Sequence, residues 1–385
     1  MTSALANLCV LDFSRVLAGP FATMMLADFG ASVTKIERPG TGDDTRTWGP
    51  PYDADGAATY FQSVNRNKDS LVLDLAVAPD LAQARRLAAA ADVVVENFRP
   101  GVMDRLGLGY EQLRTGNPGL IYCSITGFGR AAGSALAGYD LLIQAVGGLM
   151  SITGDPNGEP QKVGVALVDV LAGLFSTVGI LAALQHRNSS GLGQRVDVDL
   201  LSSLLAALVN QGSSYTAGGF VPARMGNQHP SIAPYELLPT QDGDLVLAVG
   251  NDRQFAAMCD IVGAPELAGD VRFATNRARV ENRSALRCLL VARLGRRPAG
   301  GWAKELTGAG VPAGVVNDVR GAFRLATELG LDPVVSLPRE DGTCVELTRN
   351  PVGLSATPAT YRTAPPRLGP HRAAAPARPT PSTPR

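Results

Sequence analysis

The 385-residue chain has few of the residues that build metal and disulfide sites: five cysteines and three histidines. The cysteines stand singly, with no Cys-x-x-Cys pair among them, at Cys9, Cys123, Cys259, Cys288 and Cys344. This spacing argues against a zinc site, and we expect no bound metal. Cysteines scattered in this way are also typical of a reducing compartment.

The chain also lacks an excess of charge of either sign, with 35 basic and 35 acidic side chains. A protein without a basic excess cannot neutralise many phosphates, which argues against nucleic-acid binding. No basic segment precedes an apolar run at the N-terminus, and the first basic residue is Arg15, so neither a signal peptide nor a transit peptide is expected. The apolar stretch 163–184 comes nearest to a membrane span, but Asp169 interrupts it. We therefore expect a soluble, cytoplasmic protein without a membrane partner.

Short apolar runs alternate with helical patterns over the first 200 residues. Strands are expected at 8–11, 33–37, 71–74, 93–95, 120–123 and 195–199, and helices at 21–29, 81–90 and 200–209. This alternation predicts an α/β fold with a Rossmann-like parallel sheet and ligands at the carboxyl ends of its strands. No Gly-x-Gly-x-x-Gly follows the first strand, which argues against a nicotinamide dehydrogenase.

A chain of this length usually forms more than one core, and its composition changes near residue 218. Residues 1–217 are expected to form most of a large domain, and the Gly- and Pro-rich segment 218–234 to form a linker. Residues 235–320 have strand and helix patterns of their own and predict a smaller α/β domain. The Ala/Pro/Arg-rich segment 373–385 is typical of a disordered tail.

The segment 164–173 places a single carboxylate, Asp169, at the start of a long apolar helix that continues to Leu184. A buried acid is costly unless it is paired or used. One interpretation is a helix N-terminal Asp satisfied by backbone N–H groups. The other is a catalytic acid.

Several segments together resemble the family III CoA-transferases, the group of formyl-CoA transferase, carnitine CoA-transferase and α-methylacyl-CoA racemase. Besides the Asp169 segment, they are Val-Leu-Ala-Gly-Pro at 16–20, Val-Thr-Lys-Ile-Glu-Arg-Pro-Gly at 33–40, Asn-Arg-Asn-Lys at 65–68, Glu-Asn-Phe-Arg-Pro-Gly at 96–101 and Gly-Tyr-Asp at 138–140. They follow in order within residues 8–369. The run 37–46 is similar to the succinyl-CoA:glutarate type. The C-terminus departs from the family, which usually ends in a charged helix.

The resemblance implies that Asp169 is the nucleophile. Its carboxylate would attack an acyl-CoA thioester to form an anhydride, and the CoA thiolate would then form an aspartyl-CoA thioester that the acceptor carboxylate resolves. This chemistry needs an ionised Asp169, which a helix N-terminus would favour, together with donors for the oxyanion and exclusion of water. No permanently bound cofactor is implied, because the CoA thioester is itself a substrate.

The resemblance also implies a CoA site lined by Leu17, Ala18, Arg38, Asn97, Phe98, Arg105 and Tyr139. Five of these positions have a structural alternative: a solvated Arg38, a strand-end loop at 97–98, a surface charge at Arg105 and a core aromatic at Tyr139. Leu17 stands where formyl-CoA transferase has a glutamine, which argues against a pocket for formyl or oxalyl groups.

A dicarboxylate substrate is expected from the run 41–46, and its free carboxylate would need an arginine partner. Arg46 is the first candidate and Arg15 the second. The resemblance places a glycine loop over the active site near Gly250 and Asn251, although these residues could equally form an ordinary turn that caps a helix. His186 and His229 are expected at the surface.

Two other functions are possible on the same fold. Racemases of the family carry a histidine in the middle of the Gly-x-Asp motif, where this chain has Tyr139, so the sequence disfavours racemisation. The presence of Asp169 argues against a CoA-binding protein without catalysis. The resemblance further implies an interlocked homodimer in which residues 321–372 return to complete the large domain.

Overall fold

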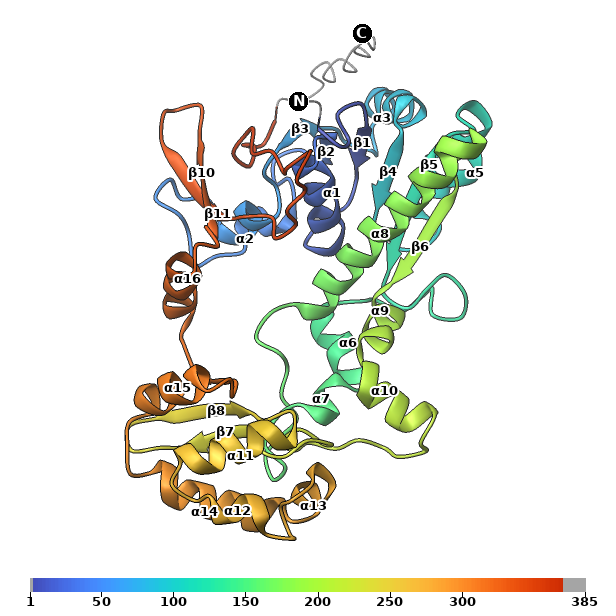
Figure 1. Ribbon diagram of the computed structural model, residues 1–385. Coiled ribbons are helices and arrows are strands. Elements are labelled where there is room, and N and C mark those ends of the chain that lie inside the picture. Colours follow the sequence, from blue (N-terminus) through green and yellow to red (C-terminus); the bar gives the residue numbers. More distant parts are fainter. Residues whose placement is uncertain (1–2, 370–385) are drawn as a thin grey trace. The chain divides into compact units, whose positions relative to one another are not determined.

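The computed structural model describes residues 3–369, which divide into two compact units (Figure 1). The first unit comprises the described parts of residues 1–149, 163–220 and 332–385. The second comprises residues 150–162 and 221–331, and so contains the predicted small domain together with a segment that precedes it by about 70 residues. The expected tail at 373–385 lies outside the described residues.

A six-stranded sheet forms the centre of the first unit, and all of its strands are parallel. In spatial order they are β3 (Lys68–Val72), β2 (Ser32–Glu37), β1 (Cys9–Asp12), β4 (Val93–Glu96), β5 (Ile121–Thr126) and β6 (Arg195–Asp199). The chain moves outward from β1 in both directions, so the order reverses between β1 and β4. In doubly wound sheets, ligands bind at the carboxyl ends of the strands at this point. The predicted parallel α/β sheet is confirmed.

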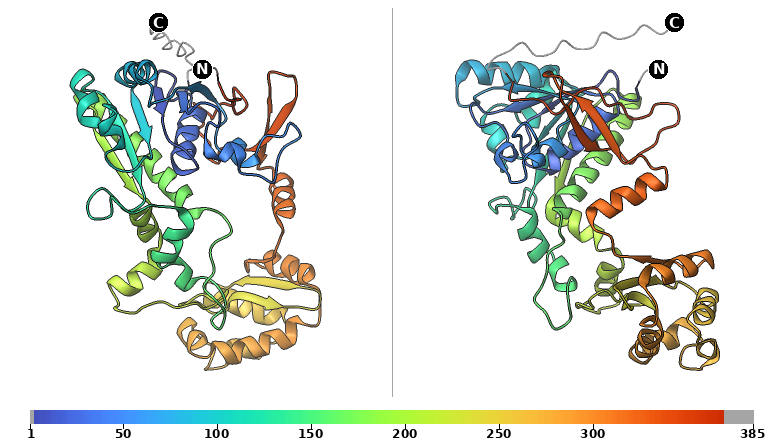
Figure 2. Two further views of the ribbon diagram at one scale, coloured as in Figure 1. Left: turned by 180° about the vertical axis from the view of Figure 1, so that it is seen from behind. Right: turned by 90° about the vertical axis from the view of Figure 1, so that its left-hand side faces the viewer.

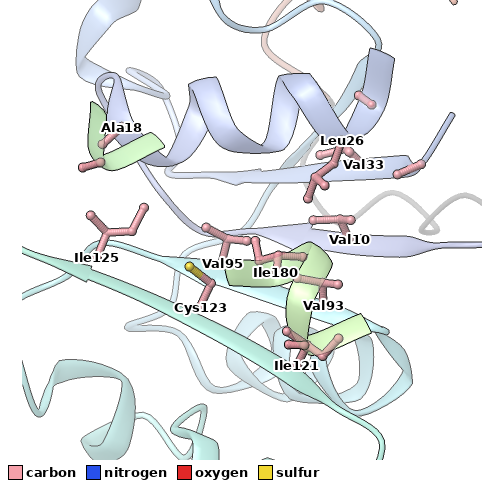
Figure 3. Packing of buried hydrophobic residues seen from close by; sticks show 14 of the residues in the cluster. Val10, Ala18, Leu26, Val33, Val93, Val95, Ile121, Cys123, Ile125 and Ile180 are labelled. Atoms are coloured by element: carbon pink, nitrogen blue, oxygen red, sulfur yellow. The ribbon is translucent and has the colours of Figure 1, made fainter. Parts of the chain in front are cut away.

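Helices cover both faces of the sheet, which explains why its central strands β1, β4 and β5 are largely apolar. Val93 and Val95 point to one face and pack with α1 (Ala18–Asp28), α8 (Leu167–Ser190) and α9 (Leu200–Ala207), as Figure 3 shows around Leu26 and Ile180. Val94 points to the other face, where the core includes residues of α3 (Ala78–Ala90), α4 (Val102–Arg105) and α5 (Tyr110–Gly116).

Helix α8 is long and apolar enough to cross a membrane by length and composition. However, it packs into the first unit along one side, where Val168, Ala172, Ile180 and Ala183 are buried. The buried side of the helix is therefore part of the core of the first unit.

The chain's last described segment, 332–369, packs onto the first unit. It begins with the antiparallel hairpin β10 (Val334–Pro338) and β11 (Cys344–Thr348), and β11 contacts α2 (Thr59–Ser63) (Figure 2). Further on, the backbone N–H of Asn67 donates to the carbonyl of Thr363 at 3.0 Å, and the backbone N–H of Thr360 donates to the carbonyl of Asp28 at 2.7 Å. The remaining elements of this unit are η1 (Asp44–Thr47), α6 (Asp140–Val146) and α10 (Val209–Thr216), and α7 (Leu149–Ile152) lies at its boundary.

The second unit has its own core and a three-stranded antiparallel sheet of β7 (Tyr235–Pro239), β8 (Asp244–Ala248) and β9 (Ala313–Val315). Its core joins this sheet to the helices through Phe255, Met258, Leu290 and Trp302. The helices are α11 (Asp252–Ile261), α12 (Glu266–Gly269), α13 (Asn276–Glu281), α14 (Arg283–Leu294), α15 (Ala299–Gly308) and α16 (Val319–Glu328).

Candidate active site

Asp169 lies in the first turn of α8, but it does not cap the helix. The backbone N–H groups of Val168 and Asp169 instead donate to Oδ1 of Asp140, at 2.7 and 3.3 Å. The other oxygen of Asp140 accepts a hydrogen bond from Gln144 at 2.6 Å. Within residues 3–369, the Asp169 carboxylate accepts no hydrogen bond. The geometry thus gives the capping role to Asp140 and leaves the Asp169 carboxylate without a partner.

This arrangement raises the pKa of Asp169 to about 7, chiefly through burial and secondly through the negative charge of Asp140. The sequence predicts that the helix N-terminus helps to keep Asp169 ionised. The structure differs because the N–H groups that would favour the anion are given to Asp140, and a second carboxylate beside Asp169 opposes its ionisation.

The wall around the start of α8 is apolar, apart from a tyrosine. Ala166 and Val170, which flank Asp169, belong to one hydrophobic cluster with Leu17 and Tyr60. The pKa of Tyr60 is raised to about 12 by burial and then by the negative charges of Asp169 and Asp140. Of the predicted CoA-site residues, Leu17 is thus brought next to the segment that holds Asp169.

Helices α1 and α8 come unusually close beside this cluster. A Cβ atom added at Gly173 would lie 2.7 Å from the carbonyl oxygen of Ala18, a distance that real Cβ atoms do not tolerate. The glycine therefore sets the distance between the two helices, one turn beyond Asp169. It places predicted residue Ala18, the first residue of α1, against α8.

A second part of the site is a cavity of about 200 Å³ at the carboxyl ends of the strands. Arg15, Arg38 and Phe98 contribute to its lining, and each follows the end of a different strand: β1, β2 and β4. Leu73, which follows β3, completes an apolar side. The sheet therefore brings together three of the residues expected from the sequence, at the edge where parallel α/β folds bind ligands.

Asn97 joins two of these strand ends. Its side chain accepts a hydrogen bond from Arg15 N at 2.9 Å and donates to the carbonyl of Arg15 at 2.7 Å. The Arg15 guanidinium lies over the ring of Phe98 at 5.3 Å from its centroid, and is 3.4 Å from Asp44. Asn97 thus fixes the loop after β1 and does not itself line the cavity.

Arg38, Arg105 and Tyr139 are exposed. Arg38 donates to Thr41 Oγ1 at 2.8 Å and pairs with Asp44 at the mouth of the cavity. Arg105 ends α4 and, among the described residues, has no ion pair. Tyr139 is 64% exposed at the start of α6, so within a single chain it is not a core aromatic. Neither Arg105 nor Tyr139 lines the cavity.

Arg46 is occupied by other groups of the protein. It makes two hydrogen bonds to Glu37, at 2.8 and 2.7 Å, and two to the carbonyl of Pro366, both at 3.1 Å. Its guanidinium also stacks 3.7 Å from the centroid of Phe61. This geometry gives no support to the prediction that Arg46 binds a substrate carboxylate.

Gly250 and Asn251 belong to the second unit, where they form the turn between β8 and α11. Asn251 Oδ1 accepts a hydrogen bond from Gln254 N at 2.9 Å and so caps α11, while Gly250 N donates to Gln254 Oε1 at 2.9 Å. The helix-capping alternative is therefore observed, and a loop that covers the active site stays a prediction. His186 is exposed on α8, and His229 Nδ1 accepts a hydrogen bond from Ser231 N at 3.1 Å.

Asp140 and Tyr60 were not selected from the sequence. Asp140 is part of the Gly-Tyr-Asp motif, so a signal was present, but its link to α8 spans 28 residues. Nothing in the local pattern around Tyr60 indicates that it lies near Asp169. Residues 3–369 hold no group of three or more His, Cys, Asp or Glu side chains that could bind a metal.

Comparison with known proteins agrees with the geometry. Residues 5–372 match the family described as CoA-transferase family III. The chain is 45% identical over 380 residues to the succinate–glutarate CoA-transferase of Agrobacterium fabrum, covering 96% of this chain and 94% of the relative. It is 46% identical over 321 residues to the acetyl-CoA:oxalate CoA-transferase of Acetobacter aceti, covering 83% and 82%.

Solved structures give the same result. A CAIB/BAIF family protein from Brucella suis has a TM-score of 0.85 at 44% identity and covers 96% of this chain and 97% of its own. The protein Rv3272 from Mycobacterium tuberculosis has a TM-score of 0.85 at 31% identity, covering 95% and 97%. The chain therefore belongs to CoA-transferase family III.

Proposed function

We propose that this enzyme moves CoA from an acyl-CoA, with succinyl-CoA as the first candidate, to a short dicarboxylic acid, and that Asp169 carries the covalent intermediates. The observation that carries the proposal is the free carboxylate of Asp169 at the start of α8, half-buried and without a hydrogen-bond partner among the described residues. A structural acid in that place would be satisfied by the protein, as Asp140 is.

The steps follow from exchange of one thioester for another. An oxygen of ionised Asp169 attacks the thioester carbon of the donor, the C–S bond breaks, and an anhydride and CoA thiolate are formed. The thiolate attacks the aspartyl carbonyl and releases the donor acid, leaving an aspartyl-CoA thioester. The acceptor carboxylate attacks this thioester, which releases the thiolate and forms a second anhydride, between the acceptor and Asp169. The thiolate then attacks the acceptor's carbonyl in this anhydride, which forms the new acyl-CoA and restores the Asp169 carboxylate. No net proton is consumed in the cycle.

The dicarboxylate part of the proposal is supported by the relatives, whose names include glutarate, oxalate, mesaconate and citramalate as substrates. Such an acid keeps one free carboxylate, which needs a cationic partner in a site of low dielectric. Arg15 suits this role better than Arg46, because its side chain is 37% exposed and its contact with Asp44 is a long 3.4 Å. Arg15 is also adjacent in sequence to the cluster beside Asp169.

The test combines trapping with an acceptor series. The enzyme is incubated with succinyl-CoA and trapped with hydroxylamine or borohydride, and peptide mass spectrometry should place the modification on Asp169. Turnover should be lost in Asp169→Ala and retained in Asp260→Ala, which removes an exposed carboxylate of the second unit. Wild-type turnover in Asp169→Ala would disprove the mechanism.

The acceptor series uses isotope-labelled succinate, glutarate and monocarboxylates of matched length, with products read by mass spectrometry. We expect a clear preference for the dicarboxylates, and a weaker preference in Arg15→Ala. Equal efficiency for glutarate and its matched monocarboxylate would disprove the dicarboxylate assignment, whereas an unchanged preference in Arg15→Ala would exclude only the role of Arg15.

We further propose that the enzyme acts as an interlocked homodimer in the cytoplasm. One side of α8 is exposed and apolar in the single chain, with Leu174, Phe175, Val178 and Leu181 between 38% and 63% exposed. These spacings place the four side chains on one helix face, and such a patch on a soluble protein is typical of an interface. Sedimentation at micromolar concentration should show a dimer, which Val178→Glu weakens and Ser189→Glu does not. A wild-type monomer would contradict this part of the proposal.

A further inference from the structure

The loop that joins β1 to α1 contains a residue in an unfavourable backbone conformation. Val16 has a φ of +71°, in the left-handed region that β-branched residues rarely adopt. Such a conformation costs free energy and persists only where surrounding contacts impose it.

Side chains from other parts of the unit hold three consecutive residues of this loop. The carbonyl of Ser14 accepts a hydrogen bond from Lys35 Nζ at 2.8 Å. Asn97 binds both backbone groups of Arg15. The N–H of Val16 points between the two oxygens of Asp43, at 3.3 Å from each. These contacts therefore fix the backbone up to the N–H of Val16, and beyond Val16 the carbonyl of Leu17 accepts a hydrogen bond from Phe21 N at 2.8 Å.

Asp43 is itself held in place by a buried ion pair. Its carboxylate lies 2.8 Å from Lys35 Nζ, and neither side chain is more than 1% exposed. It also accepts hydrogen bonds from Thr45 N at 2.9 Å and Thr45 Oγ1 at 2.7 Å. Burial alone would raise the pKa of Asp43, but Lys35 and Thr45 outweigh it and the pKa is lowered, so the group stays ionised. An ionised acceptor makes the stronger hydrogen bond to Val16.

Val16 lies between the part of the loop that lines the cavity and the part that packs beside Asp169. Before it, Arg15 lies over Phe98 in the lining of the cavity at the strand ends. At and after it, Val16 and Leu17 pack in the cluster with Ala166 and Val170, which flank Asp169. A residue in an ordinary extended or helical conformation at position 16 would turn one of these neighbours away from its site.

We infer that Asp43 is a positioning residue, which holds Val16 in its left-handed conformation and thereby places the loop 14–17 to bind acyl-CoA beside Asp169. The inference rests on the proposed function for the identity of the ligand. Asp43 and Lys35 border the cavity at the strand ends, but neither side chain is more than 1% exposed, so Asp43 acts through Val16 while Lys35 keeps it charged and in place.

A double-mutant cycle of Val16→Gly and Asp43→Asn tests the inference in the full-length enzyme. Glycine adopts a positive φ without strain, so Val16→Gly should raise Tm by about 2–4 °C despite the loss of a side chain. Asp43→Asn should lower Tm. It should lower Tm less in the Val16→Gly background, because a glycine at position 16 adopts the positive φ without the hydrogen bond to Asp43. Both single variants should bind CoA at least 5-fold more weakly by calorimetry and raise the KM for acyl-CoA more than they lower kcat.

Val209→Gly is the matched control, because Val209 is another β-branched residue with positive φ, 43°, and is 72% exposed. It should leave the Kd for CoA unchanged. Additive effects of Asp43→Asn and Val16→Gly on Tm would overturn the inference, and so would wild-type CoA affinity in Val16→Gly. If Asp43→Asn does not fold, the CoA affinity of Val16→Gly is the deciding measurement. Absence of CoA transfer in the wild type would instead disprove the proposed function, because the Tm cycle does not depend on it.

Discussion

Oδ1 of Asp140 accepts the backbone N–H groups of Val168 and Asp169, at 2.7 and 3.3 Å, and so occupies the donors that Asp169 would otherwise use. Two carboxylates thus lie at the positive end of one helix, and only one of them is compensated. The uncompensated carboxylate has its pKa raised to about 7, by burial first and by Asp140 second. A carboxylate of high pKa is a stronger nucleophile once it is ionised. Because the Asp169 carboxylate accepts no hydrogen bond from the described residues, no such bond has to be broken before it attacks.

The rate should follow the ionisation of Asp169. We expect kcat/KM for acyl-CoA to rise with pH to a midpoint near 7 and then to level off, since only the carboxylate attacks. Asp140→Asn keeps an acceptor oxygen for the helix but removes the neighbouring charge, so its midpoint should lie at lower pH. A pH–rate profile of each protein checks this. A wild-type midpoint near 4, the ordinary value for aspartate, would show that Asp169 is not perturbed.

Removing the Asp169 charge should stabilise the protein above neutral pH while it abolishes turnover. Because folding raises this pKa from 3.8 to about 7, the associated stability is fully present below pH 3.8 and is lost as pH rises through 7. Asp169→Asn stays neutral at every pH. At pH 8 the free energy of unfolding of Asp169→Asn should therefore exceed that of the wild type by about 1–2 kcal/mol. Each pKa unit represents roughly 1.4 kcal/mol, and the sum over the shift is reduced because Asp169 is partly exposed to solvent.

Denaturant unfolding at pH 4 and pH 8 measures this difference, which should be close to zero at the lower pH. Asp260→Asn, at an exposed position, serves as the control and should change stability at neither pH. Equal stability of Asp169→Asn and wild type at pH 8 would contradict the assigned pKa.

The close approach of α1 and α8 should not tolerate a side chain at Gly173. In Gly173→Ala the new methyl group would press on the carbonyl of Ala18, and we expect a loss of about 1–3 kcal/mol from overpacking, in part offset by the better helix propensity of alanine. Turnover should fall as well, because α8 carries Asp169. Gly300→Ala in α15 meets no atom within 4 Å and should be neutral or stabilising. Thermal unfolding should show a lower Tm for Gly173→Ala and an unchanged or higher Tm for Gly300→Ala, and a Gly173→Ala variant with the wild-type Tm would contradict the close contact.

Arg46 should matter for stability and not for choice of acceptor. Arg46→Ala leaves Glu37, whose side chain is 1% exposed, without its bidentate partner, and should cost about 3–5 kcal/mol. Arg324→Ala breaks an exposed pair with Glu328 on α16 and should cost less than about 1 kcal/mol. The added substitution Glu37→Gln should recover part of the loss in Arg46→Ala. A folded Arg46→Ala with wild-type stability and no preference for dicarboxylates would support the substrate role instead.

Much of the large unit could be predicted because its signals are local. The central strands β1, β4 and β5 are short, largely apolar runs, and the helices between the strands follow the 3.6-residue period, so neighbours in the sequence carry the information. The third strand, predicted at 71–74, begins instead at Lys68, because its first residues are polar. The order of the motifs likewise identified Asp169 and the strand ends that contribute Arg15, Arg38 and Phe98 to one cavity.

The roles of charged side chains could not be predicted in the same way, since their partners are distant in the chain. The sequence run that contains Arg46 suggested a substrate contact, whereas its partners are Glu37, nine residues away, and a carbonyl 320 residues away. The N–H groups at the start of α8 are bound by Asp140, which lies 28 residues before Val168 in the chain. The pKa of Asp169 is therefore raised, whereas the sequence predicted that the helix N-terminus would favour its ionised form.

The sequence by itself thus determined the parallel α/β sheet, the family and the acid at the start of α8. Only the tertiary structure decided which carboxylate receives the helix N–H groups, which arginine is already paired, and that Val16 is held in a left-handed conformation. The physical reason is that periodic burial is encoded by adjacent residues, whereas pKa values, ion pairs and backbone strain depend on burial and on groups that folding brings together from distant parts of the chain.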